Sequence, residues 1–217
     1  MNLVVSLPVN SIEFARASWE HGADAVKMHL NVHHHASDNH FGTLQQEWGF
    51  VEQLLEECPV PVGVVVGGSP DAVDADFANI LHQKFDFLSL YCHDATSSIL
   101  NQDKITRMLA CNYTYSLDEI SMFEKIGAEI LEVSIVDPEK YGEPLTARDI
   151  IHYQQVIQSV SLPTLLPTQK KIKPSEVQLL NDIGFDAVMI GAVVTGQEIN
   201  GFTEQVQCFR KAIDALV

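Results

Sequence analysis

Gly22-Ala-Asp-Ala-Val-Lys27 is the first of four segments in this 217-residue chain that follow one pattern. In each segment an acidic residue stands before a short apolar run, and three of the four begin with a glycine. Glycine commonly ends a helix, and a short apolar run bounded in this way is typical of a buried strand. The pattern therefore predicts a helix end, an acidic turn and a buried strand at residues 22–27, 84–89, 127–132 and 184–189.

Four further apolar runs lie between these segments, at residues 3–9, 60–66, 105–111 and 162–167. Together they give eight strands that alternate with helical stretches. A strand that returns parallel to its neighbour needs a crossover, usually a helix, and eight such units close into a barrel. We predict an α/β fold, a (β/α)8 barrel in which one domain spans residues 1–217.

Several helices carry recognisable start signals. Asn10 with Glu13, and Ser116 with Glu119, have the spacing of a capping box. Pro174 suits the first turn of a helix. The fourth helix is expected within residues 97–104.

The charge balance limits the partners of the chain. Its 29 acidic and 13 basic residues give a net charge of −16, which argues against nucleic acid and against an anionic membrane surface. No apolar stretch reaches membrane-spanning length, and the N-terminus lacks the basic region of a signal peptide. We expect a cytoplasmic protein with no nucleic-acid or membrane partner, and a homodimer as the default assembly.

The four cysteines, Cys58, Cys92, Cys111 and Cys208, show no CxxC spacing. This argues against a disulfide framework and against a zinc ribbon. We expect most of them to be small core residues. A catalytic role for Cys92, which lies near a strand end, is the alternative.

Aligning the four matching strands sorts their inward-facing side chains into layers, because alternate strands of such a barrel share interior layers. A lysine and a glutamate inside a barrel are costly to bury unpaired. They predict either a structural ion pair or an active site, since active sites lie at the carboxyl ends of barrel strands. From the lowest layer upward the sets are Lys27, Ser89, Glu132 and Met189, then His29, Tyr91, Ser134 and Gly191, then Asn31, His93, Val136 and Val193.

The longest connections, residues 31–43 and 137–146, both follow strands at their carboxyl ends and are candidate lids. The first holds His33, His34, His35 and His40, a density that also suits a divalent metal. Adjacent histidines on an extended segment, however, point in different directions. We expect no metal and no cofactor, and a solvated loop that supplies one substrate contact.

Lys170, Lys171 and Lys173 lie between the seventh strand and the helix expected at Pro174. Phosphate sites in these barrels are built by the loops after strands 7 and 8. Small residues at the end of strand 8 would let a phosphate approach the backbone. We predict phosphate contacts from Lys170, Lys171, Ile172, Gly191 and Ala192; a solvated lysine run is the alternative.

Three stretches resemble the ribulose-phosphate-binding barrels, namely residues 22–27, 169–176 and 187–196. That superfamily includes pentulose-phosphate 3-epimerases, hexulose-phosphate synthases, N-acetylmannosamine-6-phosphate 2-epimerases and indole glycerol phosphate synthases. The resemblance covers the whole chain in architecture and is specific in the last two strands. It implies a small phosphorylated metabolite as ligand.

The departures from these families concern the catalytic residues. Pentulose-phosphate epimerases carry a metal-binding histidine and aspartate on strand 2, where this chain has Lys27 and His29. Amino-sugar epimerases carry a lysine on strand 3 and a glutamate on strand 7, where this chain has residues 62–68 and 166–169. Schiff-base aldolases use a lysine on strand 6, where Glu132 stands. No single family of the superfamily is matched throughout.

The remaining set suits acid/base chemistry beside a carbonyl, in which a base removes a proton and a cation stabilises the enediolate oxygen. We assign Glu132 as the base, Lys27 as its electrostatic partner, and His29 or His93 as the second proton carrier. Substrate contacts are expected from Asn31, Tyr91, Ser134 and Gln169. The prediction is a sugar-phosphate isomerase or epimerase. A lyase, aldolase or synthase, or a non-catalytic phosphometabolite-binding barrel, are the alternatives.

Overall fold

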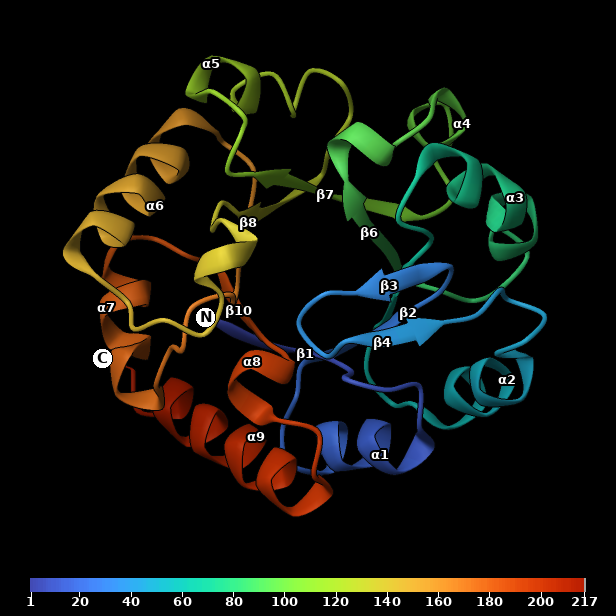
Figure 1. Ribbon diagram of the computed structural model, residues 1–217, viewed down its shortest axis with the longest axis horizontal. Helices are drawn as coiled ribbons and strands as arrows, with labels where there is room; N and C mark the ends of the chain where they lie inside the picture. Colours follow the sequence, from blue (N-terminus) through green and yellow to red (C-terminus); the bar gives the residue numbers. More distant parts are fainter. Residues whose placement is uncertain (217) are drawn as a thin grey trace.

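The computed structural model describes residues 1–216, in which eight parallel strands close into a barrel (Figure 1). β1 pairs with both β2 and β10, which closes the sheet. The predicted (β/α)8 barrel is confirmed. In order around the barrel the strands are β1 (Asn2–Ser6), β2 (Ala25–His29), β5 (Val62–Val65), β6 (Phe87–Tyr91), β7 (Thr106–Asn112), β8 (Ile130–Ser134), β9 (Thr164–Pro167) and β10 (Ala187–Ile190).

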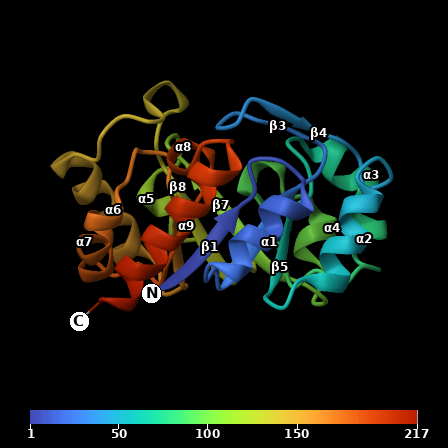
Figure 2. The same ribbon diagram turned by 90° about the horizontal axis from the view of Figure 1, so that it is seen from below.

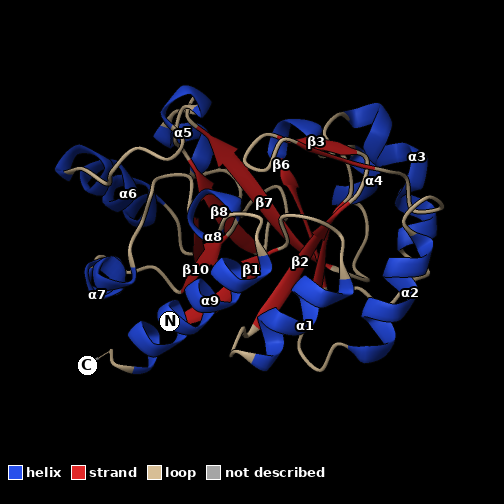
Figure 3. Cartoon of the chain, turned by 60° about the horizontal axis from the view of Figure 1, so that its bottom comes forward, coloured by secondary structure: helices blue, strands red, loops and turns tan. Residues whose placement is uncertain are grey.

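Helices surround the strands, as Figure 3 shows. Strand side chains that point outward, such as Met28, Leu88 and Leu131, are fully buried against them. A smaller apolar cluster, with Val4, Met108 and Leu165 among its members, fills the inside of the barrel. The helices are α1 (Ile12–Glu20), α2 (Trp48–Glu57), α3 (Pro70–Ile80), α4 (Ser97–Leu100), α5 (Leu117–Ile120), α6 (Ala147–Ser159), α7 (Val177–Asp182), α8 (Ala192–Thr195) and α9 (Ile199–Asp214), with 3-10 turns η1 (Cys92–Asp94), η2 (Pro138–Lys140) and η3 (Pro174–Glu176).

None of the helices in the described part of the chain is long and apolar enough to cross a membrane.

A β-hairpin that the sequence did not predict lies across one end of the barrel (Figure 2). It consists of β3 (Val32–His34) and β4 (Asn39–Phe41), paired antiparallel within the connection after β2. Asp38 adopts a left-handed φ of 56° in the turn, a conformation that aspartate tolerates better than most residues. Hydrogen bonds from Asn39 to Pro8 (2.7 Å) and from Gln197 to Ser37 (2.8 Å) tie the hairpin to neighbouring loops.

The acidic residue of each matching segment fastens the amino end of the preceding strand. Its carboxylate accepts the N–H of a residue at the start of that strand, at 2.7–3.0 Å. Its own N–H donates to the carbonyl of the same residue, at 2.8–3.0 Å. The pairs are Asp24 with Leu3, Asp86 with Val62, Glu129 with Arg107, and Asp186 with Thr164.

The glycines of these segments behave as predicted. Gly22, Gly127 and Gly184 have φ values of 98°, 97° and 108°, the left-handed region in which helices commonly end. Glycine reaches this region without the steric cost that a side chain would add.

Two of the three predicted helix start signals are confirmed by the structure, and one is wrong. The Ser116–Glu119 capping box is confirmed, and Pro174 opens η3. The Asn10–Glu13 box was wrong, because Asn10 donates instead to the carbonyl of His29 (2.8 Å) and α1 starts after Ser11. The amide of Asn10 is therefore used to hold β2.

We predict that Asp186→Ala lowers the free energy of unfolding by about 1–3 kcal/mol, because the buried N–H of Thr164 loses its acceptor. Urea unfolding monitored by circular dichroism measures this. The matched control is Asp182→Ala, which removes only a surface contact with Gln178 within α7 and should cost no more than about 0.5 kcal/mol. Equal losses in the two variants would contradict the fastening role.

Candidate active site

A cavity of about 390 Å³ opens at the carboxyl ends of the strands. A volume of this size suits a small metabolite. Strand residues form its floor and walls, and the connections after β2 and β8 contribute to its roof. Among the residues that line the cavity are Ser6, Lys27, His29, His34, His35, Ser89, Tyr91, His93, Ala110, Glu132, Ser134, Tyr141, Thr168, Gln169, Gly191, Ala192 and Val193.

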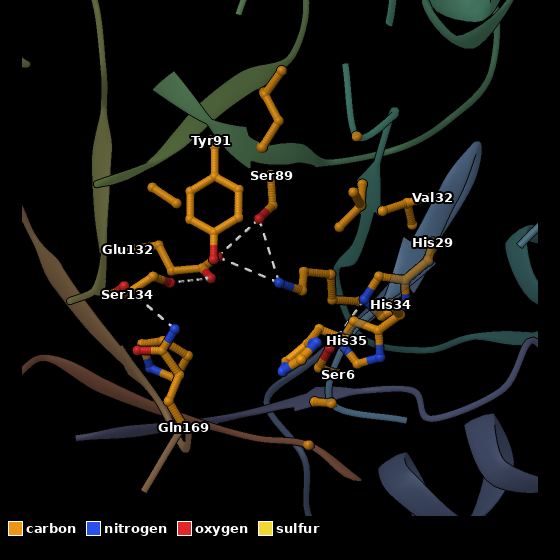
Figure 4. Close-up of a pocket in the computed structure, with 18 of the residues that line it drawn as sticks. Ser6, His29, Val32, His34, His35, Ser89, Tyr91, Glu132, Ser134 and Gln169 are labelled. Atoms are coloured by element: carbon orange, nitrogen blue, oxygen red, sulfur yellow. Dashed lines mark hydrogen bonds and ion pairs between the residues drawn. The ribbon is translucent and has the colours of Figure 1, made fainter. Parts of the chain in front are cut away.

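The floor holds a buried ion pair between Lys27 of β2 and Glu132 of β8. The ammonium Nζ lies 3.3 Å from Glu132 Oε2, and the two residues are 5% and 7% exposed. Ser89 of β6 donates to the same carboxylate oxygen at 2.8 Å. Figure 4 shows Glu132 beside Ser89 and Ser134. The structure therefore places Lys27, Ser89 and Glu132 in one inward-facing layer, as the strand alignment predicted.

Glu132 is held by donors on both of its oxygens. Oε2 accepts from Ser89 and Lys27, while Oε1 accepts from Ser134 at 3.0 Å. Ala110 of the neighbouring β7 pairs with Glu132 in the strand register and is small enough to leave the carboxylate open to the cavity. The carboxylate thus has a fixed orientation at the bottom of the cavity.

His29 stands one layer above Lys27 on the same strand. Its Nε2 lies 3.4 Å from Ser6 Oγ, whereas Nδ1 is buried and has no hydrogen-bond partner among residues 1–216. Burial, reinforced by nearby His34 and Lys27, holds the pKa of His29 well below its usual 6.5. The imidazole is therefore neutral at pH 7.

The hairpin supplies histidines to the roof. The ring of His34 lies 4.5 Å from that of His29, and its Nδ1 is 2.8 Å from Ser37 Oγ. Burial, together with the charge of Lys27, lowers the pKa of His34 to about 4. His35 meets the ring of Tyr141 edge-on at 5.2 Å, so the connections after β2 and β8 touch over the cavity.

Gln169 joins the loop after β9 to the loop after β8. Its Oε1 accepts the N–H of Val136 at 3.1 Å, and its Nε2 donates to the carbonyl of Ser134 and to the hydroxyl of Tyr141. The side chain is 6% exposed. Sequence reasoning found Gln169 but missed Tyr141, because only the length of that loop, not a residue within it, was a signal.

The residues of the lysine run that were predicted to contact a phosphate lie away from the cavity. Nζ of Lys170 contacts Glu143 at 3.0 Å and Asp149 at 3.9 Å, so it pairs with acidic residues of the preceding β8–α6 connection and of α6. Lys171 is exposed, and Ile172 belongs to the apolar core with its N–H bonded to the carbonyl of Lys170. Among the described residues, these three do not line the cavity, whereas Gly191 and Ala192 do.

Two residues expected in the top layer depart from it because their strands end first. Asn31 follows the end of β2, and its amide donates to Val66 and Asp76 outside the cavity. His93 lies in η1 after β6, half-exposed at the rim, and stacks on Tyr91 at 5.2 Å. Tyr91 stays in the wall as predicted, and burial raises the pKa of its phenol.

Cys92 is half-buried beside this rim. Burial raises the pKa of its thiol, so the thiolate that nucleophilic chemistry needs is disfavoured. The free cysteines otherwise differ in burial: Cys111 is in the core, while Cys58 and Cys208 are half-buried.

In residues 1–216 we find no group of three or more His, Cys, Asp or Glu side chains arranged to hold a metal ion. The exposed histidines of the hairpin pair with each other instead. His33 stacks on His40 at 4.0 Å and contacts Asp38 at 2.8 Å.

We predict that the protein loses stability as the pH falls from about 7 to 4, and that His34→Gln flattens this loss. Unfolded His34 binds its proton near pH 6.5 but folded His34 only near pH 4, so acid favours the unfolded chain. His34 alone should lower the free energy of unfolding at pH 4 by about 2–3 kcal/mol relative to pH 7.

Chemical unfolding at several pH values measures this slope. His152→Gln, at an exposed position on α6, is the control and should leave the slope unchanged. Parallel curves for the wild type and His34→Gln would show that His34 is not buried in its neutral form.

No family model and no curated protein matches this chain. Thiamine phosphate pyrophosphorylase from Pyrococcus furiosus is similar in structure, with a TM-score of 0.66 and 18% identity over 98% of this chain and 95% of that one. KGPDC from Streptococcus mutans gives a TM-score of 0.70 and 13% identity over 99% and 98%. A chain of the tryptophan synthase complex from Pyrococcus furiosus gives 0.73 and 10% over 96% and 97%. The protein therefore has the (β/α)8 barrel fold that its resemblance to ribulose-phosphate-binding barrels implied.

Proposed function

We propose that this protein is an enzyme that moves protons beside the carbonyl group of a small phosphorylated sugar, as an isomerase or epimerase. The observation that carries the proposal is the carboxylate of Glu132, fixed by Ser89, Ser134 and Lys27 at the floor of a covered cavity. A carboxylate held in this way suits a base, and a lysine beside it suits a developing oxyanion.

Glu132 takes the proton from the carbon next to the carbonyl. The electron pair of that C–H bond forms the carbon–carbon double bond, and the π pair of the carbonyl moves to its oxygen, which Lys27 stabilises. In an epimerase the second proton carrier returns a proton to the same carbon on the other face. In an isomerase Glu132 returns the proton to the neighbouring carbon, and the second proton carrier moves the hydroxyl proton to the former carbonyl oxygen.

His29 is the better candidate for the second proton carrier. It is buried beside the floor and is held neutral, and its Nδ1 has no hydrogen-bond partner in the described part of the chain, so the ring can accept a proton at one nitrogen and donate from the other. His93 lies half-exposed at the rim, stacked on Tyr91. Its position suits a contact with the outer part of a substrate.

The covered cavity supports an enediolate mechanism, because water would protonate or degrade such an intermediate. His35 from the hairpin and Tyr141 from the β8 loop meet above the cavity. Tethers between the hairpin and neighbouring loops hold that cover in place.

For the phosphate group we propose the backbone at the end of β10 rather than the lysine run. The N–H of Gly191 donates to Thr168, while no partner among residues 1–216 accepts from the N–H groups of Ala192 and Val193. Backbone N–H groups of this kind bind phosphate oxygens well. The name of one structural relative, thiamine phosphate pyrophosphorylase, supports a phosphorylated ligand.

A lyase, aldolase or synthase is the second candidate. Cleavage of a carbon–carbon bond next to a carbonyl leaves the same enediolate, which Lys27 would stabilise equally. The name of another structural relative, tryptophan synthase, supports this candidate. In a non-catalytic binding barrel the ion pair would be structural only.

We predict that the wild type exchanges the α-proton of a ketose phosphate with deuterium from the solvent, and that Glu132→Gln lowers the rate by about 10²–10⁴-fold. The probes are dihydroxyacetone phosphate, D-ribulose 5-phosphate and D-fructose 6-phosphate, followed by NMR in D₂O. The amide keeps the shape of the carboxylate but cannot act as the base. Glu139→Gln, on the exposed η2 turn, is the matched control and should exchange at the wild-type rate.

The stability of the variant separates a catalytic from a structural role. Loss of the charge leaves Lys27 buried and unpaired, at a cost of about 3–5 kcal/mol. If Glu132→Gln does not fold, the double variant Lys27→Met/Glu132→Gln removes both charges and should fold without exchanging. A folded Glu132→Gln with undiminished exchange, or a wild type that exchanges none of the probes, would contradict the proposed function.

We predict that Ala192→Pro weakens binding of D-fructose 6-phosphate at least about tenfold by removing one N–H group, roughly 1.4 kcal/mol. Gly191 before it is extended (φ −147°, ψ −169°), a conformation that a following proline accepts. Ala147→Pro, at the start of α6 after the extended Thr146, is the matched control and should bind normally. Calorimetry measures both; equal affinities would place the phosphate elsewhere.

A further inference from the structure

Tyr141 lines the cavity and has no part in the proton transfers assigned to Glu132 and His29. It follows η2 in the connection between β8 and α6. Its N–H donates to the carbonyl of Pro138 at 3.2 Å, and the N–H of Gly142 donates to the carbonyl of Gln169 at 2.9 Å. The backbone on both sides of the ring is therefore held.

The hydrogen bonds around Gln169 determine what the Tyr141 hydroxyl can do. Oε1 of Gln169 accepts from Val136, which leaves Nε2 to face Ser134 and Tyr141. An amide nitrogen only donates, so the phenol oxygen accepts there. The O–H of Tyr141 is thus left to donate to another oxygen.

The amide nitrogen of Gln169 that donates to Tyr141 also donates to the carbonyl of Ser134, and the hydroxyl of Ser134 donates to Glu132. This places the Tyr141 phenol on the side of the cavity that holds the carboxylate. Burial, as the main cause, raises the pKa of this phenol, so it keeps its proton at neutral pH.

We propose that Tyr141 is a further catalytic residue, which donates a hydrogen bond from its phenol to the substrate oxygen that becomes the enediolate oxygen. The inference rests on the proposed function. Lys27 from β2 and Tyr141 from the connection after β8 then act on one oxygen, and Glu132 takes the proton from the adjacent carbon. No proton needs to leave the phenol, because the hydrogen bond strengthens as negative charge develops on the oxygen.

The ring of Tyr141 also meets the ring of His35 edge-on at 5.2 Å, which joins it to the hairpin. The phenol is therefore held by its own loop, by Gln169 and by the hairpin.

Tyr141→Phe tests the role of the hydroxyl alone, because the ring and its contact with His35 are kept. We expect the deuterium exchange rate on the ketose phosphate probes to fall by about 10²–10³-fold, the usual loss for one oxyanion donor. The affinity for inorganic phosphate should not change, and the melting temperature should fall by no more than about 2–4 °C, the effect of the one hydrogen bond that Gln169 loses. Tyr113→Phe, the same substitution at a half-exposed position, is the matched control and should exchange normally.

Phosphoglycolohydroxamate, a mimic of an enediolate, gives a readout that does not depend on turnover. Tyr141→Phe should bind it at least about tenfold more weakly than the wild type does, a difference of roughly 1.4 kcal/mol. Weaker binding of the mimic together with unchanged binding of phosphate supports a donor to the enediolate oxygen.

The remaining outcomes overturn the inference in distinguishable ways. If the wild type exchanges a probe and Tyr141→Phe exchanges it equally fast, Tyr141 is not catalytic but the proposed function stands. If the melting temperature of the variant falls by more than about 4 °C and the variant loses phosphate and hydroxamate binding alike, Tyr141 only positions its loop. If the wild type exchanges none of the probes, this inference falls together with the proposed function.

Discussion

The buried ion pair of Lys27 and Glu132 is the constraint on which the rest of the site depends. β2 and β8 lie directly across the barrel from each other, so each charge reaches the axis from an opposite wall. Below the pair the barrel is filled by apolar side chains that offer no polar partner. A lone charge at this depth would cost several kcal/mol, so the pair, with Ser89 and Ser134, has to be assembled as a unit.

The two ends of the barrel differ in how their connections are held. At the amino end, the carboxylates of residues such as Asp86 and Asp186 hold the first N–H groups of the strands. These contacts repeat at alternate strands, and each is made by a residue of the short turn that leads into the next strand. The carboxyl end lacks such a repeat among the described residues, and its connections are free to form a hairpin and a covering loop.

The sequence predicted what the strand period determines and missed what lies beyond the strands. Lys27 and Glu132 could be placed because side chains alternate strictly within β2 and β8. Asn31 and His93 could not, because β2 ends at His29 and β6 at Tyr91, after which the alternation no longer applies. The Lys170 side chain points toward Glu143, with which it forms an ion pair. Glu143 lies in a loop, where no strand or helix period predicts the position of a side chain.

The charge on the cavity floor changes during the proposed reaction in the sense that catalysis needs. Before the reaction the floor is close to neutral, because Lys27 is matched by Glu132 and burial keeps His29 and His34 uncharged. When Glu132 takes the substrate proton it becomes neutral, and the charge of Lys27 is left uncompensated. This happens as negative charge develops on the substrate oxygen. The pair therefore supplies its positive charge at the step that creates the oxyanion, and not before.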